Sequence, residues 1–109
     1  MPTTDETGAP LGRAEITADA TGVPIIKLTG EIDLSNVDSV RATIESTVSG
    51  APERIVFDLR GLDFLDSSGI ALLLYAAANA RTVQLRHSSD IVRRLIEVTG
   101  LSDVLHLES

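Results

Sequence analysis

Hydrophobic and polar positions follow two different periods in the first half of the chain. Residues 14–18 alternate weakly, Thr21-Gly22 offers a turn, and residues 23–29 form a second apolar segment. This pattern predicts an antiparallel hairpin whose second strand ends at Gly30, with residues 31–34 as a connection. Apolar side chains then recur every three or four positions from 37 to 48, which predicts a helix to about Ser49. Ser35 is the expected N-cap of this helix, and Gly50 follows its end.

The second half of the chain repeats a strand and helix alternation. Residues 54–59 are a nearly continuous apolar run, typical of a strand covered on both faces. After a short loop, residues 70–79 are apolar nearly all round and predict a deeply packed helix. Residues 82–86 predict a fourth strand and residues 104–107 a short last one. Between them a third helix is expected, and its inner stripe is predicted to be Ile91, Leu95 and Val98.

This order of elements predicts one α/β domain with a mixed, mostly parallel sheet, an N-terminal antiparallel hairpin and three to four helices. Parallel strands place their carboxyl ends at one edge of the sheet, which is the usual functional edge of such folds. Segments 30–33, 66–69 and 87–90 all fall there. We therefore expect Asp33 and Ser67 to be near neighbours, although they are far apart in the sequence.

Composition and charge narrow the classes of function. The chain has 109 residues, a net charge of −7, a single lysine and no cysteine, and only 3% of its residues are aromatic. Such a chain is unsuited to binding nucleic acid directly, and a partner with a basic face fits it better. Residues 1–12 contain no apolar run and predict a flexible tail before a domain over 13–109. We expect a soluble, cytoplasmic protein that does not bind a membrane.

The tetrapeptide Asp66-Ser67-Ser68-Gly69, just before the second predicted helix, has two interpretations. In the simpler one Asp66 caps the helix, the serines fill its first turn and Gly69 permits close approach. In the other one, a serine accepts a phosphate at a helix start, where backbone N–H groups are free. The phosphate would carry about −1.5 to −2 charges and change which partner the surface accepts. The two interpretations are compatible.

Other candidate chemistry is weaker. Glu31 and Asp33 suit either ordinary loop polarity or a fixed negative charge that orients a partner. An aspartyl-phosphate receiver could use Asp58 or Asp66, but the chain begins with a hairpin and has no lysine late in the sequence. A glycine-rich phosphate loop is missing, and the two histidines lack the spacing of a metal site. We therefore expect no enzymatic activity, no metal and no cofactor.

Several segments together resemble the STAS-domain anti-sigma factor antagonists of bacteria. The resemblance covers about residues 15–107. It rests on Leu28-Thr29-Gly30-Glu31-Ile32-Asp33, on residues 55–59 with Phe64-Leu65-Asp66-Ser67-Ser68-Gly69-Ile70, and on the helix end 92–101. Many members of that family have a glycine two residues after Gly69, where this chain has Ala71.

The resemblance implies a regulatory switch. In the family, the unphosphorylated antagonist binds an anti-sigma factor that is often also a serine kinase, and a sigma factor is released. Phosphorylation turns the antagonist off, and a metal-dependent serine phosphatase restores it. The resemblance assigns the acceptor to Ser67, with Ser68 as the alternative. It places Glu31, Asp33, Asp66, Ser67, Ser68 and Gly69 at the partner surface.

A second function is compatible with the same fold. STAS-like domains also serve as accessory or scaffold subunits of lipid transporters and sensor complexes, where phosphorylation is not obligatory. The acidic surface and the retained serine favour the sigma-regulatory role over this alternative.

Overall fold

A computed structural model of the chain describes residues 12–108 and shows a single layer of helices packed on one sheet. The elements follow one another as β1 (Arg13–Ala18), β2 (Pro24–Ile32), α1 (Val37–Val48), β3 (Arg54–Leu65), α2 (Ser67–Asn79), β4 (Thr82–Arg86), α3 (Asp90–Val98), the 3-10 helix η1 (Leu101–Asp103) and β5 (His106–Leu107). The strands lie in the order β1-β2-β3-β4-β5. β1 is antiparallel to β2 and the other pairs are parallel. The predicted fold class and topology are confirmed.

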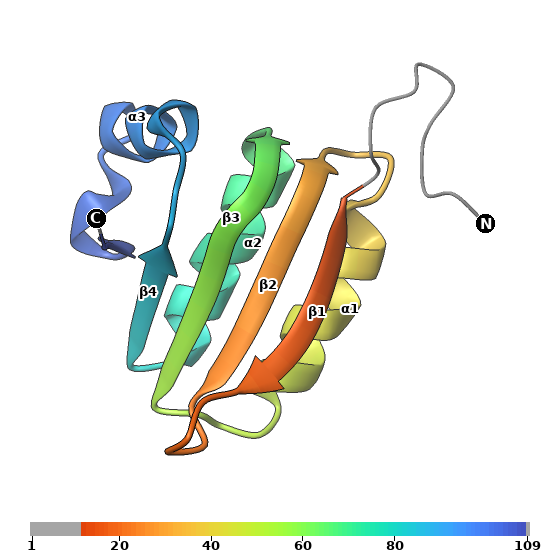
Figure 1. Cartoon of the computed structure of the whole chain (residues 1–109), viewed down its shortest axis with the longest axis vertical. Helices are drawn as coiled ribbons and strands as arrows, with labels where there is room; N and C mark the ends of the chain where they lie inside the picture. Colours follow the sequence, from red (N-terminus) through yellow and green to blue (C-terminus); the bar gives the residue numbers. More distant parts are fainter. Residues whose placement is uncertain (1–11, 109) are drawn as a thin grey trace.

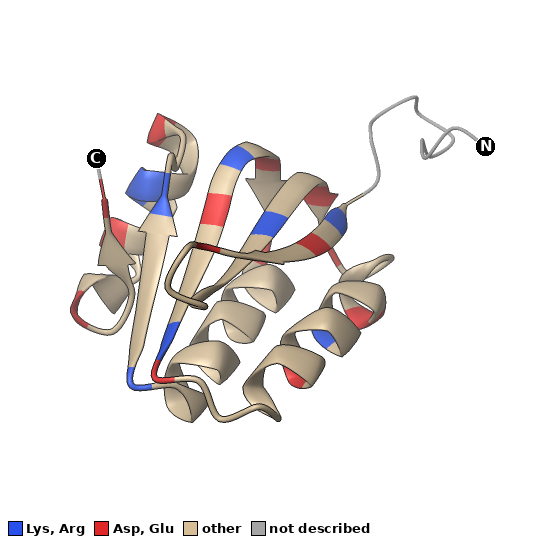
Figure 2. Cartoon of the chain, turned by 60° about the horizontal axis from the view of Figure 1, so that its bottom comes forward, with Lys and Arg blue, Asp and Glu red and all other residues tan. Residues whose placement is uncertain are grey.

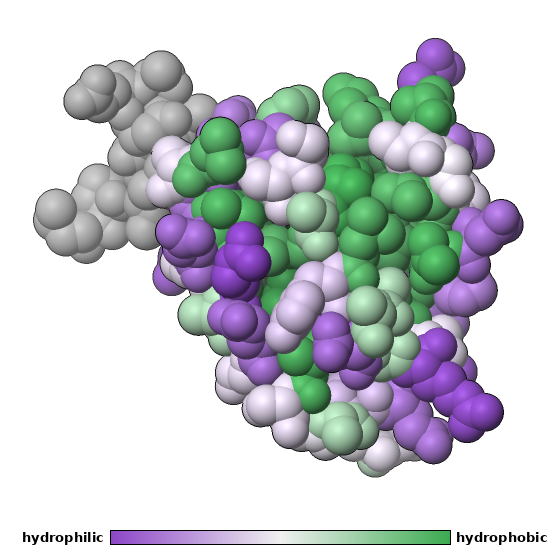
Figure 3. Space-filling model, turned by 180° about the vertical axis from the view of Figure 1, so that it is seen from behind, coloured by the Kyte–Doolittle hydropathy of each residue, from purple (hydrophilic) through white to green (hydrophobic). Residues whose placement is uncertain are grey.

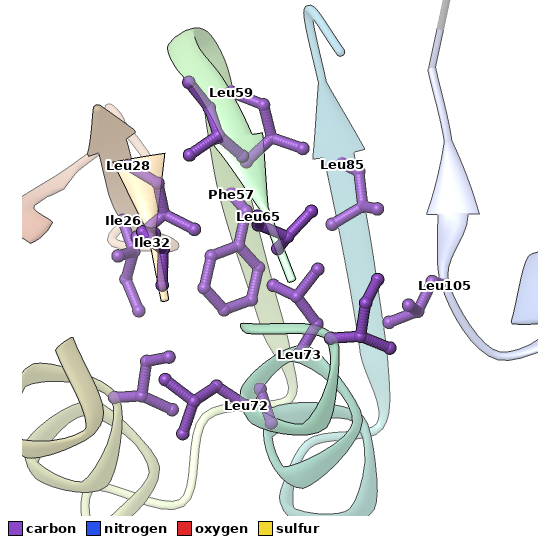
Figure 4. Close-up of a cluster of buried hydrophobic side chains, with 14 of the residues drawn as sticks. Ile26, Leu28, Ile32, Phe57, Leu59, Leu65, Leu72, Leu73, Leu85 and Leu105 are labelled. Carbon is purple, nitrogen blue, oxygen red and sulfur yellow. The ribbon is translucent and has the colours of Figure 1, made fainter. Parts of the chain in front are cut away.

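The hydrophobic core lies between the sheet and the helices α1 and α2, which cover the same face of the sheet (Figure 1). Alternate side chains of β2 and β3 point into it, because successive residues of a strand face opposite sides. Ile26, Leu28, Phe57 and Leu59 are at most 1% exposed. They meet Leu73 and its neighbours on α2 (Figure 4). Almost all of the core is aliphatic, as the composition predicts.

The opposite face of the sheet carries a row of alternating charges. In the register of the sheet, Glu15 lies opposite Lys27, Lys27 opposite Asp58, and Asp58 opposite Arg86, across four neighbouring strands (Figure 2). Arg86 also forms an ion pair with Glu108, with 2.9 Å between Nε and Oε2. The prediction of a third strand covered on both faces is confirmed for Ile55, Val56 and Phe57, which are at most 1% exposed although successive residues face opposite sides. The helices α1 and α2 lie on only one of these faces.

Strands β2 and β3 extend further than predicted. The expected connection after Gly30 continues as strand to Ile32, and the expected loop after Leu59 continues as strand to Leu65. The two extensions pair with each other, Glu31 opposite Phe64 and Ile32 opposite Leu65, with register irregularities on the way. Each extension is thus stabilised as a strand by its pairing with the other, and this pairing is not visible in the sequence of either segment alone.

The start of α1 differs from the sequence prediction. Asn36 rather than Ser35 is the N-cap, and it makes no side-chain capping bond. The Ser35 hydroxyl instead donates to Asp33 Oδ1 at 2.6 Å. After the helix, the left-handed backbone conformation falls on Ala51, with φ of 51°, and not on Gly50.

The later elements require three further corrections. α2 begins at Ser67, three residues before the predicted start at Ile70. The buried residues of α3 are Val92 and Ile96. Of the predicted inner stripe only Leu95 packs against the core, because Ile91 and Val98 are 67% and 74% exposed. β5 is shortened to His106–Leu107. Gly100 ends the α3 region with φ of 75°, as the predicted helix end requires.

The predicted tail lies almost wholly outside the described residues. Within residues 12–108, no helix is long and apolar enough to cross a membrane.

Candidate functional site

The carboxyl ends of β2 and β3 meet at one edge of the sheet, where the sequence places its candidate residues. The Asp66 N–H donates to the Ile32 carbonyl at 3.1 Å, which ties the end of β2 to the start of α2. The segments that contain Asp33 and Ser67 are therefore brought together, as predicted. His87, from the third segment expected at this edge, contacts the middle of β3 instead: its Nε2 lies 3.1 Å from Arg60 Nη2.

The first turn of α2 is organised by a single carboxylate. Asp66 Oδ1 accepts hydrogen bonds from the Ser68 N–H at 2.9 Å, the Ser68 hydroxyl at 2.5 Å and the Gly69 N–H at 3.3 Å. These bonds favour the charged form, and the bond from the Ser68 hydroxyl contributes most to holding the pKa of Asp66 below its usual value. Asp66 is therefore both the predicted cap and a fixed negative charge at the site.

Two adjacent serines in this turn have different environments. Ser68 is half-buried and its hydroxyl is taken by Asp66. Ser67 is exposed, and its hydroxyl makes no hydrogen bond to any residue between 12 and 108. The sequence leaves this choice between neighbouring serines open, because it does not show which hydroxyl the cap takes.

The expectation that several free N–H donors await a phosphate at this helix start is wrong. The N–H groups of Ser68 and Gly69 are bonded to Asp66 Oδ1, and the Ile70 N–H is bonded to the Asp66 carbonyl at 3.0 Å. A phosphate on Ser67 would therefore have to compete with Asp66 for these donors. It would add charge to the surface without being neutralised by that turn.

Gly69 has the predicted steric role. A Cβ at this position would lie 2.9 Å from Leu65 Cδ1, which is closer than real Cβ contacts. Gly69 therefore lets α2 start directly against the end of β3. This close approach positions Ser67 at the rim of the sheet.

The turn between β2 and α1 is built around Asp33. Asp33 Oδ1 accepts from the Ser35 N–H at 2.9 Å and from its hydroxyl, while the Asp33 N–H donates to Asn36 Oδ1. The Asn36 side chain also donates to the Glu31 carbonyl at 2.7 Å. Asp33 therefore has a structural role besides its charge. Asn36 is a positioning residue that the sequence prediction missed, because Ser35 offered an equally good cap.

Negative charge dominates this edge. The segments 30–36 and 62–68 contain the four carboxylates of Glu31, Asp33, Asp63 and Asp66, and neither segment contains a lysine or arginine. A partner that docks here meets a rim of one sign. Complementary charges raise association rates and select for partners with a basic surface.

Comparison with known proteins agrees with this geometry. The family model described as "Mlab, STAS domain" matches residues 16–107. The chain belongs to the STAS-domain family. An anti-sigma F factor antagonist from Lysinibacillus sphaericus is 35% identical over 83 residues, which cover 71% of this chain and 70% of that protein.

Solved structures show the same fold. An anti-sigma factor antagonist from Mycobacterium paratuberculosis superposes with a TM-score of 0.81 at 25% identity, over 89% of this chain and 85% of that one. The unphosphorylated form of the antagonist SpoIIAA has a TM-score of 0.68 at 26% identity, over 89% of each chain. SpoIIAA of Bacillus has also been solved in a phosphorylated form, with a TM-score of 0.69 at 24% identity over 89% of this chain and 92% of that one. The expected fold and family are thereby confirmed.

Proposed function

We propose that this protein is an anti-sigma factor antagonist switched off by phosphorylation of Ser67. The unphosphorylated form binds an anti-sigma factor with serine kinase activity and frees a sigma factor, and a metal-dependent serine phosphatase reverses the modification. Its role is regulatory, and the family relationship supports this class of function. The relative SpoIIAA has a phosphorylated form, which supports the switch.

The observation that carries the choice of acceptor is the difference between the two serines. Ser67 is exposed at the rim and keeps its hydroxyl free within the described chain, whereas the Ser68 hydroxyl is bonded to Asp66. A kinase can reach Ser67 without breaking the cap of α2. Phosphorylation of Ser68 would cost the hydrogen bond that helps to hold the first turn.

Electrostatics explains how the phosphate acts. Phosphoserine 67 would stand beside Asp66, on an edge that already carries three other carboxylates. An interface that desolvates Ser67 would then have to bury a dianion next to like charges. A loss of about 3 kcal/mol weakens binding more than about 100-fold. No large rearrangement of the fold is needed.

Phosphopeptide mapping of the protein isolated from its own cells tests this proposal. We expect a phosphatase-sensitive mass increase that maps to Ser67, is absent from Ser67→Ala and persists in Ser68→Ala. Phosphate on Ser68 instead would overturn the acceptor. A chain that stays unmodified at rest and under stress would favour the transporter-accessory or scaffold role.

A further inference from the structure

The two edges of the sheet differ in how well they are protected. β1 is the first strand in the order of the sheet, and its six residues pair with β2 in one unbroken register (Figure 1). β5, at the other edge, has only two residues. Proteins protect sheet edges with very short strands, β-bulges, prolines or lysines, because an open edge pairs with other chains. β1 is not shortened, has no bulge and contains no proline or lysine.

The hydrogen bonds of the hairpin show which backbone groups of β1 face this edge. The Asp19 N–H donates to the Val23 carbonyl at 3.0 Å, so Asp19 is hydrogen-bonded toward β2. Hydrogen-bonded and non-hydrogen-bonded residues alternate along an antiparallel pair. Because the register of β1 and β2 continues from this pair without a shift, the N–H and carbonyl groups of Ala14, Ile16 and Ala18 are directed away from β2. No described strand lies on that side of β1.

The same three residues have small or apolar side chains on the helix side of the sheet. Ile16 lies opposite Ile26, which is fully buried in the core, and opposite residues of two strands face the same side. Ile16 is nevertheless 51% exposed, because β1 ends the sheet. Hydrophobic surface occurs elsewhere on the helix side as well (Figure 3), so it is the open backbone edge that distinguishes β1. Such an edge binds an added strand.

The hydrogen-bonding pattern of this edge is complementary to itself. When Ile16 lies opposite Ile16 of a second, antiparallel copy, Ala14 lies opposite Ala18 of that copy and Ala18 opposite its Ala14. All three outward-directed residues then form pairs that can exchange two hydrogen bonds each. The side chains of Ile16 from the two copies meet at the centre, where a pair of β-branched residues stabilises neighbouring strands.

Charge selects the same register. It places Arg13 opposite Asp19 of the second copy, and opposite charges at facing positions stabilise a sheet. Moving the second copy by two residues places Glu15 opposite Glu15 in one direction and opposite Asp19 in the other. Both shifted registers bring like charges together, which destabilises the pairing. The edge therefore fits a second copy of this chain in one register.

We propose that the protein forms a symmetric dimer in which the β1 strands of two copies pair with Ile16 opposite Ile16. The two sheets join into one, with the helices of both copies on the same side. Because the joined strands are antiparallel, the carboxyl ends of β2 and β3, and with them Ser67, lie at opposite ends of the joined sheet in the two copies. The dimer would thus present two phosphorylation sites that do not obstruct each other.

The dimer is expected to be weak. Its contact is a single pair of strands, and each copy carries a net charge of −7, which opposes association. Interfaces of small area belong to transient complexes. We therefore expect a dissociation constant between about 1 μM and 1 mM.

Sedimentation equilibrium of the full chain over a range of concentrations tests the proposal. Ile16→Lys places two lysines opposite each other and should weaken the dimer by about tenfold or more. Ile91→Lys is the matched control, because it makes the same substitution at an isoleucine of α3 that is 67% exposed. It should dimerise like the unaltered chain. Melting temperatures show whether both variants are folded.

Thr17 tests the register without altering the core. It is exposed, and in the proposed register it lies opposite Glu15 of the second copy. Thr17→Lys should strengthen the dimer about twofold to fivefold relative to Ile91→Lys, which has the same net charge, and Thr17→Glu should weaken it. In the register that places Glu15 opposite Glu15, Thr17 lies opposite Arg13, and both effects change sign. That result would overturn the proposed register.

Three other results would overturn the dimer itself. The first is an unaltered chain that stays monomeric up to about 1 mM. The second is a dimer that a folded Ile16→Lys variant leaves intact. The third is a dimer that Ile91→Lys dissociates equally, which would assign the contact to α3. None of these measurements involves a kinase or an anti-sigma factor, so failure of the dimer leaves the proposed switch at Ser67 unaffected.

Discussion

Both α2 and α3 begin at a pair of adjacent serines beside an aspartate, each directly after a parallel strand. In α2 the aspartate comes first, so Asp66 is the cap and Ser67 keeps an exposed, free hydroxyl. In α3 the aspartate comes last, and the second serine, Ser89, becomes the cap by accepting the Val92 N–H at 3.2 Å. The order of the same residue types decides whether a serine holds the helix or remains available for chemistry.

The first serine of each pair also differs between the helices. Ser67 is exposed, but the hydroxyl of Ser88 is buried and has no partner within residues 12–108. A kinase can therefore reach the hydroxyl of Ser67 more readily than that of Ser88. The α3 start serves as an internal control for every statement about the α2 start.

The largest expected effect is on partner binding. Ser67→Asp adds a charge beside Asp66 and should weaken binding to the anti-sigma kinase by about tenfold or more. Ser89→Asp adds the same charge at the α3 start but keeps a good N-cap residue, so it should change binding by about twofold at most. Calorimetry with both variants checks this. Tight binding by Ser67→Asp would contradict the electrostatic account of the switch.

The next effect is on stability. Asp66→Ala removes the acceptor of three hydrogen bonds and should lower the free energy of unfolding by about 2 kcal/mol. Ser89→Ala removes a single capping bond and should cost about 1 kcal/mol. Urea unfolding of both variants measures the difference. Equal losses would mean that the two additional hydrogen bonds of Asp66 add nothing to the stability of the α2 cap.

The two caps should respond differently to acid. The pKa of Asp66 is lowered in the folded protein, mainly by the hydroxyl of Ser68. Its contribution is therefore complete above the unfolded value of about 3.9 and is lost as the pH falls through the lower folded value. Asp66→Asn should flatten the fall of stability below about pH 4, whereas Ser89→Ala should leave its slope unchanged. Unfolding curves at a series of acidic pH values check this, and a slope unaltered by Asp66→Asn would contradict it.

The smallest expected effect is on stability, at Ser68 and Ser88, the two serines that do not act as the N-cap. Ser88→Ala removes a buried hydroxyl without a partner in the described chain and should change stability by about 0.5 kcal/mol or less. Ser68→Ala removes a bonded hydroxyl and should cost about 1 kcal/mol. Thermal unfolding of the two variants ranks them. A larger loss for Ser88→Ala would show that its hydroxyl is satisfied in solution.

Much of the fold could be predicted because the periodic segments are long and the connections short. Where prediction failed, the missing information was a neighbour. Gly61 and Asp63 made residues 60–65 look like a loop, yet the extended β2 supplies a hydrogen-bonding partner for that segment. In α3, apolar residues fall on two adjacent stripes, so periodicity alone could not separate the buried Val92 and Ile96 from the exposed Ile91.

The site was predictable as a place but not in its details. Strand order predicted that the segments of Asp33 and Ser67 would meet, because parallel strands share a carboxyl edge. Ser67 and Ser68 differ because only the Ser68 hydroxyl is bonded to Asp66. This difference depends on side-chain geometry, which the sequence pattern does not show. Asp33 forms hydrogen bonds with Ser35 and Asn36 within the turn after β2. This structural role could not be predicted, because it depends on where those two residues lie in the folded turn.

The most direct test of the switch compares the affinity of the unphosphorylated protein and of the protein phosphorylated at Ser67 for the anti-sigma kinase. We predict that the phosphorylated form binds more than about 100-fold more weakly while its melting temperature stays the same. Equal affinity of the two forms would contradict the central claim that Ser67 is the switch.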